Sequence, residues 1–251
     1  SLQQLKTALS AADDYAGFIF EPLVQGVGGM AMYRPEALDP LIALCRDHEL
    51  ITIADEVMTG FGRTGTYFAS DQLNEKPDVM CLSKGLTGGT MAMGITTCPQ
   101  AIYDAFYADD KMQTLFHGHS FTANPVACAA ALASWELLQQ HATWQQIQQI
   151  TEKHEAFIRY IKDHPNVKAA RQTGTILALE LGSQEATSYF SKITDQLKPF
   201  FMEQGLLIRP LGNTLYLMPP YCITADELDQ LHQGVEAGLA YLDQAEKPQS
   251  V

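Results

Sequence analysis

Short runs of β-branched and apolar residues alternate with longer stretches in which apolar residues recur every three or four positions. The first pattern predicts buried strands, and the second predicts helices with one apolar face. The expected strands are 16–20, 51–54, 78–82 and 93–97, and the expected helices are 2–12, 35–48, 125–140 and 144–163. Strands and helices that alternate in this way predict an α/β fold with a mostly parallel sheet.

The pattern changes after Pro165 and Asn166. From there we expect a strand at 174–181, a helix at 185–204, a hairpin-like pair of strands at 206–209 and 214–218, and a closing helix at 226–242. The polar residues 245–251 predict a disordered tail. The sequence therefore predicts two domains. Residues 1–165 hold the sheet and the long connecting helices, and residues 166–251 form a smaller α+β domain.

A charged residue stands at or just beyond the end of two of the expected strands. Asp55 follows Ile51–Ala54, and Lys84 comes two residues after the run 78–82. In an open α/β sheet, ligands bind at the carboxyl ends of the strands, so we expect both side chains in one crevice. Such a pair suits pyridoxal phosphate, because a lysine can hold this cofactor as a Schiff base and an acid can pair with its pyridine nitrogen. The residues alone also allow a cap or turn role for Asp55 and a solvated surface charge for Lys84.

The sequence around this pair resembles the class III (ω-) aminotransferases in three segments, 53–57, 59–65 and 83–89. The resemblance implies fold type I of the pyridoxal-phosphate-dependent transferases, with residues 1–165 as the carboxyl-terminal part of the large cofactor domain. It also implies that Lys84 forms the Schiff base, that Asp55 pairs with the pyridine nitrogen and that Val57 lies against the cofactor ring. Met58 departs from the family, in which many members carry a glutamine that contacts the cofactor hydroxyl.

Residues 116–125 lead into an alanine-rich helix. A hydroxyl and backbone amides just before a helix can bind an anion, and a plain helix-capping loop is the alternative. In class III aminotransferases the matching loop reaches across a dimer to the cofactor phosphate of the other subunit. By this resemblance Gly118 and Ser120 bind the cofactor, and the protein is a homodimer with shared active sites.

Arg209 is the remaining candidate, because a guanidinium at the end of the expected strand 206–209 can grip a carboxylate bidentately. A surface arginine is the alternative. The segments 24–30, 85–91, 117–128 and 216–221 resemble the biotin-pathway branch of the family, which converts 8-amino-7-oxononanoate to 7,8-diaminononanoate. The resemblance favours adenosylmethionine as the amino donor, with lysine as the alternative. The resemblance implies that Arg209 and Gly118 bind substrate, Arg209 through the substrate carboxylate.

Members of this family are considerably longer, and the resemblance covers only their carboxyl-terminal part. We therefore expect an incomplete active site in this chain, which is either a fragment or one of two separate chains. Other class III reactions remain open: ornithine, 4-aminobutyrate or diamine transamination, or an aminomutase. A fragment that serves assembly without catalysis is a further alternative.

The composition of the chain restricts the classes of molecule that we expect it to bind. The net charge of −13 repels phosphate backbones and anionic membranes, so we expect small-molecule substrates, an amino donor and a keto acceptor, rather than nucleic acid or membrane. Neither a membrane span nor a signal peptide is expected. The five scattered cysteines predict reduced, buried thiols in a cytoplasmic protein. His117 and His119 lack further ligands, so no metal is expected. Residues 60–65 match the dinucleotide-binding fingerprint, but no amphipathic helix follows them, so we do not expect a nicotinamide cofactor.

Overall fold

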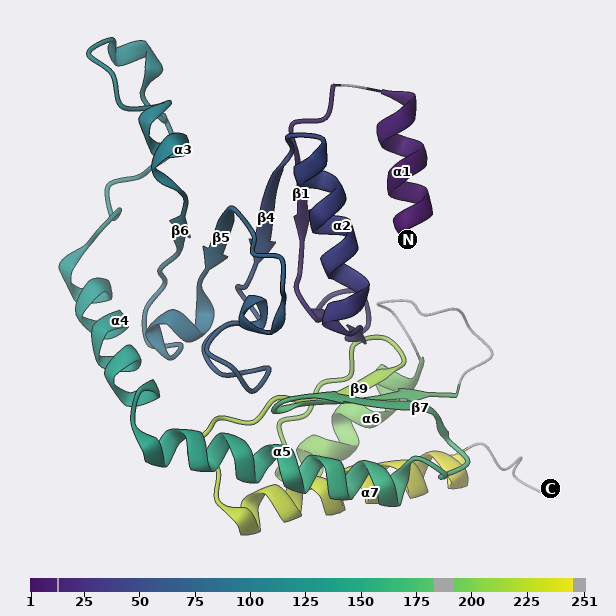
Figure 1. Ribbon diagram of the computed structural model, residues 1–251. Helices are drawn as coiled ribbons and strands as arrows, with labels where there is room; N and C mark the ends of the chain where they lie inside the picture. The colour runs from purple at the N-terminus through teal and green to yellow at the C-terminus, as the bar shows by residue number, and fades with distance from the viewer. Residues whose placement is uncertain (13, 183–191, 246–251) are drawn as a thin grey trace. The chain divides into compact units, whose positions relative to one another are not determined.

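The computed structural model describes residues 1–12, 14–182 and 192–245 (Figure 1). Contacts divide the chain into two compact units. The first unit holds residues 1–23, 33–62 and 66–140, and the second holds residues 24–32, 63–65 and those from 141 onward. The long helix α5 (His141–Ile161) thus makes its contacts within the second unit, while the division into domains after residue 165 stays a prediction.

The first unit is built on a four-stranded sheet in the order β1-β4-β5-β6. Its strands are β1 (Gly17–Phe20), β4 (Ile51–Asp55), β5 (Val79–Leu82) and β6 (Ile95–Thr97). β1–β4 and β4–β5 are parallel pairs, which confirms the predicted α/β fold with a mostly parallel sheet. β6 runs antiparallel to β5, because the chain between them forms only the short 3-10 helix η2 (Lys84–Thr87) and no crossover helix. Among the described strands β1 forms one edge, and its Ile19 is 65% exposed.

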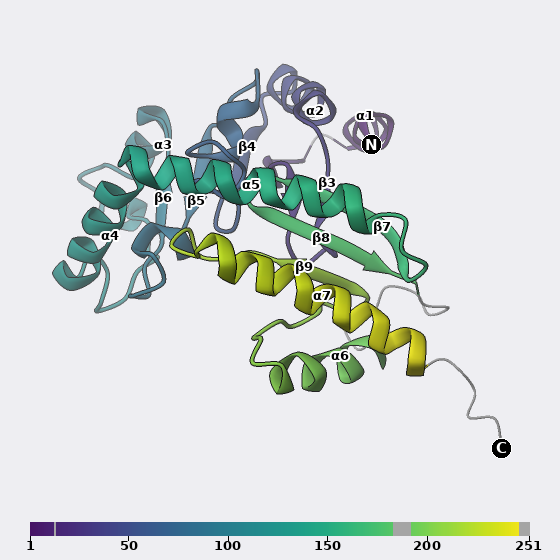
Figure 2. The ribbon, with the colours of Figure 1, turned by 90° about the horizontal axis from the view of Figure 1, so that it is seen from below.

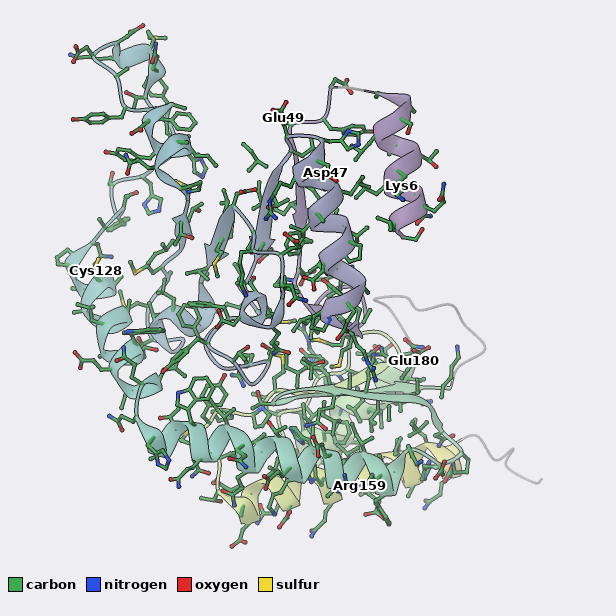
Figure 3. The ribbon with its side chains drawn as sticks, viewed as in Figure 1. Lys6, Asp47, Glu49, Cys128, Arg159 and Glu180 are labelled. Carbon is green, nitrogen blue, oxygen red and sulfur yellow. The ribbon has the colours of Figure 1, made fainter. Side chains whose placement is uncertain are left out.

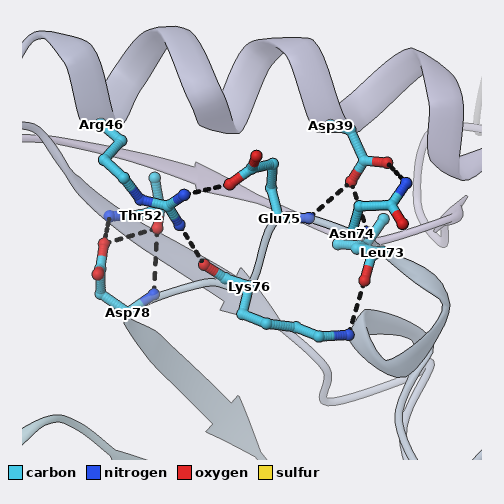
Figure 4. Close-up of polar contacts among 8 residues, drawn as sticks. All are labelled: Asp39, Arg46, Thr52, Leu73, Asn74, Glu75, Lys76 and Asp78. Carbon is cyan, nitrogen blue, oxygen red and sulfur yellow. Dashed lines mark hydrogen bonds and ion pairs between the residues drawn. The ribbon is translucent and has the colours of Figure 1, made fainter.

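Helix α2 (Pro35–Asp47) packs against β4 and is tied to the loop that leads into β5 (Figure 4). Asp39 on this helix accepts hydrogen bonds from the backbone amides of Asn74 and Glu75, at 3.0 and 3.1 Å. Arg46, two turns further along, forms an ion pair with Glu75. The buried face of the helix consists of Leu38, Ile42 and Cys45. Apolar contacts on one face and polar contacts on the other therefore fix this helix beside the sheet.

The other helices of the first unit are α1 (Leu2–Ala11), α3 (Gln100–Asp104) and α4 (Pro125–Leu138), with the short 3-10 helices η1 (Ala69–Gln72) and η3 (Lys111–Gln113). The sequence pattern did not predict α3, which is only five residues long. α4 packs against η2, and the hydroxyl of Ser134 on α4 donates to the carbonyl of Gly85 at 3.1 Å. Helix α4 thereby supports the turn that carries Lys84.

The second unit contains a three-stranded antiparallel sheet, β7 (Val167–Thr173), β8 (Ile176–Leu181) and β9 (Thr214–Leu217), in that order. Three helices pack against it: α5, α6 (Lys192–Glu203) and α7 (Ala225–Ala245). Figure 2 shows α5 and α7 lying side by side. The core between sheet and helices includes Phe157, Ile161, Leu177, Leu179, Leu197, Phe201, Leu215, Val235 and Leu239.

A small hairpin, β2 (Val24–Gln25) and β3 (Ala31–Met32), also belongs to this unit. Arg171 on β7 donates to the carbonyl oxygens of Gly29 and Met30, at 2.5 and 2.8 Å, and so holds the tip of the hairpin. Glu180 on β8 accepts from the same guanidinium at 3.2 Å. The guanidinium of Arg171 therefore holds the glycine-rich turn between β2 and β3 against β7.

One expectation about the second unit is wrong, and one of its strands was not predicted. Residues 206–209 form no strand, because Leu206 and Ile208 pack into the core while the residues between and after them are exposed. Their alternation reflects burial rather than strand pairing, and β9 pairs with β8 instead. The pattern also missed β7, in which only Val167 is buried. The first part of the expected helix 185–204, and the expected tail beyond Ala245, lie outside the described residues.

Two histidines face each other between α5 and α7. Nδ1 of His154 lies 2.9 Å from Nε2 of His232, and both side chains are buried. Burial lowers the pKa of His154 to about 3, and the charge of His232 acts in the same direction. Burial likewise lowers the pKa of His232 to about 4, against the opposing effect of Asp229. The folded unit therefore holds both imidazoles neutral.

This pair makes stability depend on pH. Unfolded histidines titrate near pH 6.5, so between about pH 6.5 and 4 the unfolded chain binds more protons than the folded one. The free energy of unfolding should fall as the pH falls through this window, by up to about 1.4 kcal/mol per pH unit for each histidine. We expect His154→Gln to flatten this slope by about one proton. Calorimetric melting between pH 4.5 and 7.5 measures it, and equal slopes in wild type and His154→Gln would contradict the assignment.

None of the helices in the described ranges combines the length and the apolar character that crossing a membrane requires. All five cysteines are free thiols. Cys45 is buried as expected, whereas Cys98 and Cys222 are exposed, because they lie in surface segments outside the strands and helices.

Candidate active site

Asp55 and Lys84 lie at the same edge of the sheet, as the strand pattern predicted. Asp55 is the last residue of β4, and its register partner in the parallel strand β5 is Cys81. Lys84 follows the end of β5 by two residues. The carboxyl ends of two adjacent parallel strands thus deliver an acid and an amine to one place, where α/β sheets bind their ligands.

Lys84 is presented on an unusual backbone turn. Its φ is 46°, in the left-handed region that non-glycine residues rarely adopt and that is concentrated at functional sites. The side chain is exposed, and within the described part of the chain Nζ takes part in no hydrogen bond or ion pair. Gly85 lets the turn pack closely, since a Cβ there would lie 3.0 Å from Cβ of Phe61. The amine of Lys84 is therefore carried on a strained turn that packs closely against Phe61.

Asp55 is half-buried and uses one of its two oxygens locally. Oδ1 accepts the backbone amide of Val57 at 3.0 Å, which is the turn role considered as the alternative. Oδ2 receives no hydrogen bond from any residue that the structure describes. A carboxylate can hold the turn with one oxygen and a ligand with the other, so the two roles do not exclude each other. Val57, also half-buried, is positioned by the same turn.

The neighbouring strand β1 adds polar groups to this edge. Glu21 follows β1 directly, and its backbone carbonyl accepts a hydrogen bond from the hydroxyl of Tyr33. Burial raises the pKa of Tyr33 to about 12, and the charges of Glu21 and Glu56 act in the same direction. Tyr33 therefore remains a neutral donor at physiological pH.

Sequence reasoning missed Glu56, the residue after Asp55. Its side chain is fully buried and its two oxygens accept four hydrogen bonds, from Thr59, Ala69 and Ser70. The available signal was weak: an acid directly after a buried strand with a threonine three residues later. Its partners at 69 and 70 come from the next turn of the chain, which no local pattern connects with it.

Gly118 and Ser120 lie on the exposed loop before α4. The side chain of Asn124 caps this helix by accepting the amides of Val126 and Ala127, at 3.0 and 3.1 Å. Because these two amides already donate to Asn124, they are not available to bind an anion at the helix terminus. A phosphate role for Gly118 and Ser120 would use the loop itself and stays a prediction.

Arg209 lies in the second unit, on the segment between α6 and β9. It does not stand at the end of a strand, contrary to the expectation, because residues 206–209 form none. Its side chain is exposed, and Ile208 and Pro210 on either side are buried. Buried neighbours fix the backbone beneath an exposed guanidinium, so the residue still suits recognition of an anionic group. Its substrate role stays a prediction.

No metal centre emerges from the described ranges, in which no three side chains of His, Cys, Asp or Glu come together in a way that could hold an ion.

Comparison with known proteins gives one family over most of the chain. The family described as aminotransferase class III matches residues 1–239. The chain belongs to the class III aminotransferases. The recognition made from the segments around Asp55 and Lys84 is thereby confirmed.

Curated class III relatives are similar at high coverage of this chain. The adenosylmethionine-8-amino-7-oxononanoate aminotransferase of Synechococcus elongatus is 45% identical over 225 residues, which make up 90% of this chain and 52% of that protein. The enzyme of the same name from Geobacter sulfurreducens is 38% identical over 244 residues, 92% of this chain and 52% of that protein. The chain spans about half the length of the curated relatives it matches.

Solved structures of aminotransferases share the fold. The adenosylmethionine-8-amino-7-oxononanoate aminotransferase of Methanocaldococcus jannaschii superposes with a TM-score of 0.88 at 30% identity, covering 96% of this chain and 57% of that one. An (S)-enantioselective ω-transaminase from Thermomicrobium roseum gives a TM-score of 0.87 at 28% identity, with 96% and 55% covered. The predicted fold type I of the pyridoxal-phosphate-dependent transferases is confirmed.

Class III aminotransferases depend on pyridoxal phosphate, and the residues at the sheet edge fit this group. The cofactor needs an amine that is free to react with its aldehyde and an anion for its ring nitrogen. Among the described contacts, Nζ of Lys84 and Oδ2 of Asp55 are uncommitted. The donor set on this edge therefore matches the chemistry of the cofactor.

Proposed function

We propose that the protein containing this chain transfers an amino group to 8-amino-7-oxononanoate, forming 7,8-diaminononanoate in biotin synthesis, with adenosylmethionine as the amino donor. The supporting observation is the placement of Asp55 and Lys84 on adjacent strand ends in a chain that is 45% identical to the Synechococcus enzyme of that name. Because the chain covers about half of that relative, the reaction is proposed for the complete gene product.

In this proposal Lys84 is the residue that binds the cofactor covalently and then carries the proton. When bound, pyridoxal phosphate supplies an electron sink for the substrate carbon that loses its proton. Nζ of Lys84 takes that proton and returns it at the neighbouring position, as a general acid–base catalyst does. Its exposure at the sheet edge and its free amine support this role.

Asp55 is proposed to hold a proton on the ring nitrogen. A negative charge fixed beside the ring stabilises the positive charge there, and fixed charges do this without reorganisation during the reaction. The hydrogen bond from the amide of Val57 to Oδ1 orients the carboxylate beforehand. Val57 itself is proposed to contact the face of the ring.

We propose that the protein acts as a homodimer in which Gly118 and Ser120 serve the cofactor phosphate of the other subunit. The segment around them exposes large apolar side chains, which a monomer rarely does at this density. These residues are Tyr103, Phe106, Tyr107, Met112, Leu115, Phe116, Phe121 and Val126, each between 45% and 78% exposed. A second copy of the chain is the partner that would cover them. Equilibrium sedimentation of the complete gene product should give twice the mass of one subunit.

The five free thiols support a reducing compartment, and we place the enzyme in the cytoplasm. The sequence division at residue 165 is proposed as the boundary between the large and the small domain. The second unit, with its own sheet and core, supports a separate carboxyl-terminal domain in which Arg209 is found.

Amino transfer by the complete gene product tests the proposed function. With adenosylmethionine and 8-amino-7-oxononanoate we expect parallel lines in double-reciprocal plots, because the two substrates use one site in turn. Lysine in place of adenosylmethionine tests the identity of the amino donor. Ornithine, 4-aminobutyrate and a diamine as alternative substrates separate this reaction from others of the family. Turnover that is faster with one of those three alternatives would assign the protein to another class III reaction.

Arg209→Ala is expected to weaken binding of the oxo-acid substrate. A charge-assisted pair between guanidinium and carboxylate contributes about 1.5–3 kcal/mol, so KM for 8-amino-7-oxononanoate should rise by roughly 10- to 100-fold. The KM for the amino donor should change much less. Arg159→Ala is the matched control, since that side chain is 70% exposed on α5 and points away from the sheet (Figure 3). An unchanged KM in Arg209→Ala would remove this residue from the substrate site.

A further inference from the structure

Glu56 is a buried carboxylate to which the proposed reaction assigns no role. Its side chain is 0% exposed. Oε1 accepts the backbone amide and the hydroxyl of Ser70, at 2.7 and 2.6 Å. Oε2 accepts the hydroxyl of Thr59 at 2.7 Å and the amide of Ala69 at 3.0 Å. Within the described chain no cation pairs with it, so these four donors alone replace the water that burial removes.

The backbone of Glu56 is fixed as firmly as its side chain. Its amide donates to the carbonyl of Cys81 at 3.0 Å, which extends the β4–β5 pairing by one residue beyond Asp55. Its own carbonyl accepts the amide of Gly60 at 3.0 Å. The backbone of Asp55 is therefore held by its pairing with Cys81 on β5 and by the next residue, Glu56, whose side chain makes four hydrogen bonds.

The turn that Glu56 anchors also supports Lys84. Phe61 follows in this turn with a φ of 59°, and its side chain packs directly on Gly85, the residue after Lys84. A Cβ at Gly60 would lie 2.9 Å from the carbonyl oxygen of Glu56, so the turn is also closely packed against Glu56 itself. One buried carboxylate thus connects the positions of Asp55 and Lys84.

We propose that Glu56 is a positioning residue, which holds Asp55 and the turn at Lys84 in their working places. This inference rests on the proposed function. Side chains of successive strand residues point to opposite faces, so Glu56 acts through the backbone of β4 and the packing of Phe61 rather than by touching reacting atoms. Small displacements of such groups matter, because an error near 1 Å can cost about 100-fold in rate.

Glu56→Gln is the sharpest test, because both oxygens of the carboxylate act as acceptors and two of the four donors are backbone N–H groups. Each oxygen of Glu56 faces one backbone N–H and one hydroxyl. A hydroxyl can rotate and accept from the glutamine amide, whereas a backbone N–H cannot. Whichever way the glutamine is oriented, one backbone amide at 69 or 70 therefore loses its acceptor while the volume of the side chain is unchanged.

We expect Glu56→Gln in the complete gene product to lower kcat by about 10- to 100-fold, with little change in KM for the amino donor. The pH titration of the absorption band of bound pyridoxal phosphate should shift, since that band reports the surroundings of Lys84 and Asp55. The control is Asp78→Ala at the opposite end of β4, where Asp78 accepts the amide and the hydroxyl of Thr52 at 2.8 and 2.7 Å (Figure 4). It should lower the melting temperature and leave kcat and the absorption titration unchanged.

The outcomes separate the two proposals. If the wild-type protein neither binds pyridoxal phosphate nor transfers an amino group, the proposed function is wrong, and this inference fails with it. An active wild type whose Glu56→Gln variant keeps its kcat and its absorption titration, measured well below the melting temperature, would overturn the positioning role alone. If Glu56→Gln does not fold, Thr59→Val removes one of the four hydrogen bonds at nearly constant volume. A smaller drop in kcat with the same shift supports the role, and no change overturns it.

Discussion

Lys84→Ala is expected to abolish covalent attachment of pyridoxal phosphate and to reduce amino transfer by roughly 10⁴-fold, the upper end of what one general acid–base contributes. In the proposed mechanism this one amine both binds the cofactor and moves the proton, so the substitution removes both functions. Reduction of the cofactor-loaded complete gene product with borohydride, followed by peptide mass mapping, should find a pyridoxyl adduct on Lys84 in the wild type and none in the variant. Turnover assays supply the second measurement.

Lys162→Ala is the matched control for this experiment, because Lys162 is an exposed lysine in the second unit that no proposed role involves. It should retain the adduct and full turnover. An adduct that remains in Lys84→Ala and maps to a different lysine would show that the strand-end assignment chose the wrong amine. A wild type that carries no adduct would instead point to a reaction without this cofactor.

Asp55→Asn is expected to keep the fold and the bound cofactor but to lower kcat by about 10²- to 10³-fold, the usual loss when one fixed electrostatic group is removed. The asparagine oxygen can still accept the amide of Val57, so the turn after β4 should survive. What is lost is the negative charge that, in the proposed mechanism, keeps the ring nitrogen protonated. Steady-state kinetics and the absorption spectrum of the bound cofactor measure the two effects separately.

Asp47→Asn, at the exposed end of α2, is the corresponding control and should behave as wild type (Figure 3). Full turnover in Asp55→Asn would show that this carboxylate does not serve the ring nitrogen. Loss of the cofactor together with turnover would assign Asp55 a binding role in place of the electrostatic one.

The placement of Asp55 and Lys84 at one edge of the sheet could be predicted because it depends on a local property, whereas their roles there stay predictions. Each follows a short buried run, and parallel pairing of two such runs brings their carboxyl ends together. The mostly parallel sheet followed from the same alternation. The roles assigned to Gly118, Ser120 and Arg209 came from the family resemblance, since nothing in their own spacing distinguishes them from surface residues.

Features that depend on tertiary contacts were not predictable. Glu56 accepts a hydrogen bond from Ser70, which lies fourteen positions away in a separate turn, and such a contact produces no periodic pattern in the sequence. Alternating burial at Leu206 and Ile208 imitates a strand because core packing and strand pairing can produce the same period of two. The reversed direction of β6 depends on how the short connection after β5 closes, and the apolar pattern within β6 itself does not show in which direction the strand runs.

The exposed strand β1 has a practical meaning for work on residues 1–251 by themselves. Within the described sheet, one side of its backbone has no neighbouring strand, and the apolar side chain of Ile19 is exposed. Such an edge is a template on which another molecule can add a strand, which is the usual start of aggregation in β proteins. Clouding during concentration, inclusion bodies and losses on filtration are therefore to be expected from this stretch, and a lysine in place of Ile19 is the natural remedy for preparing it.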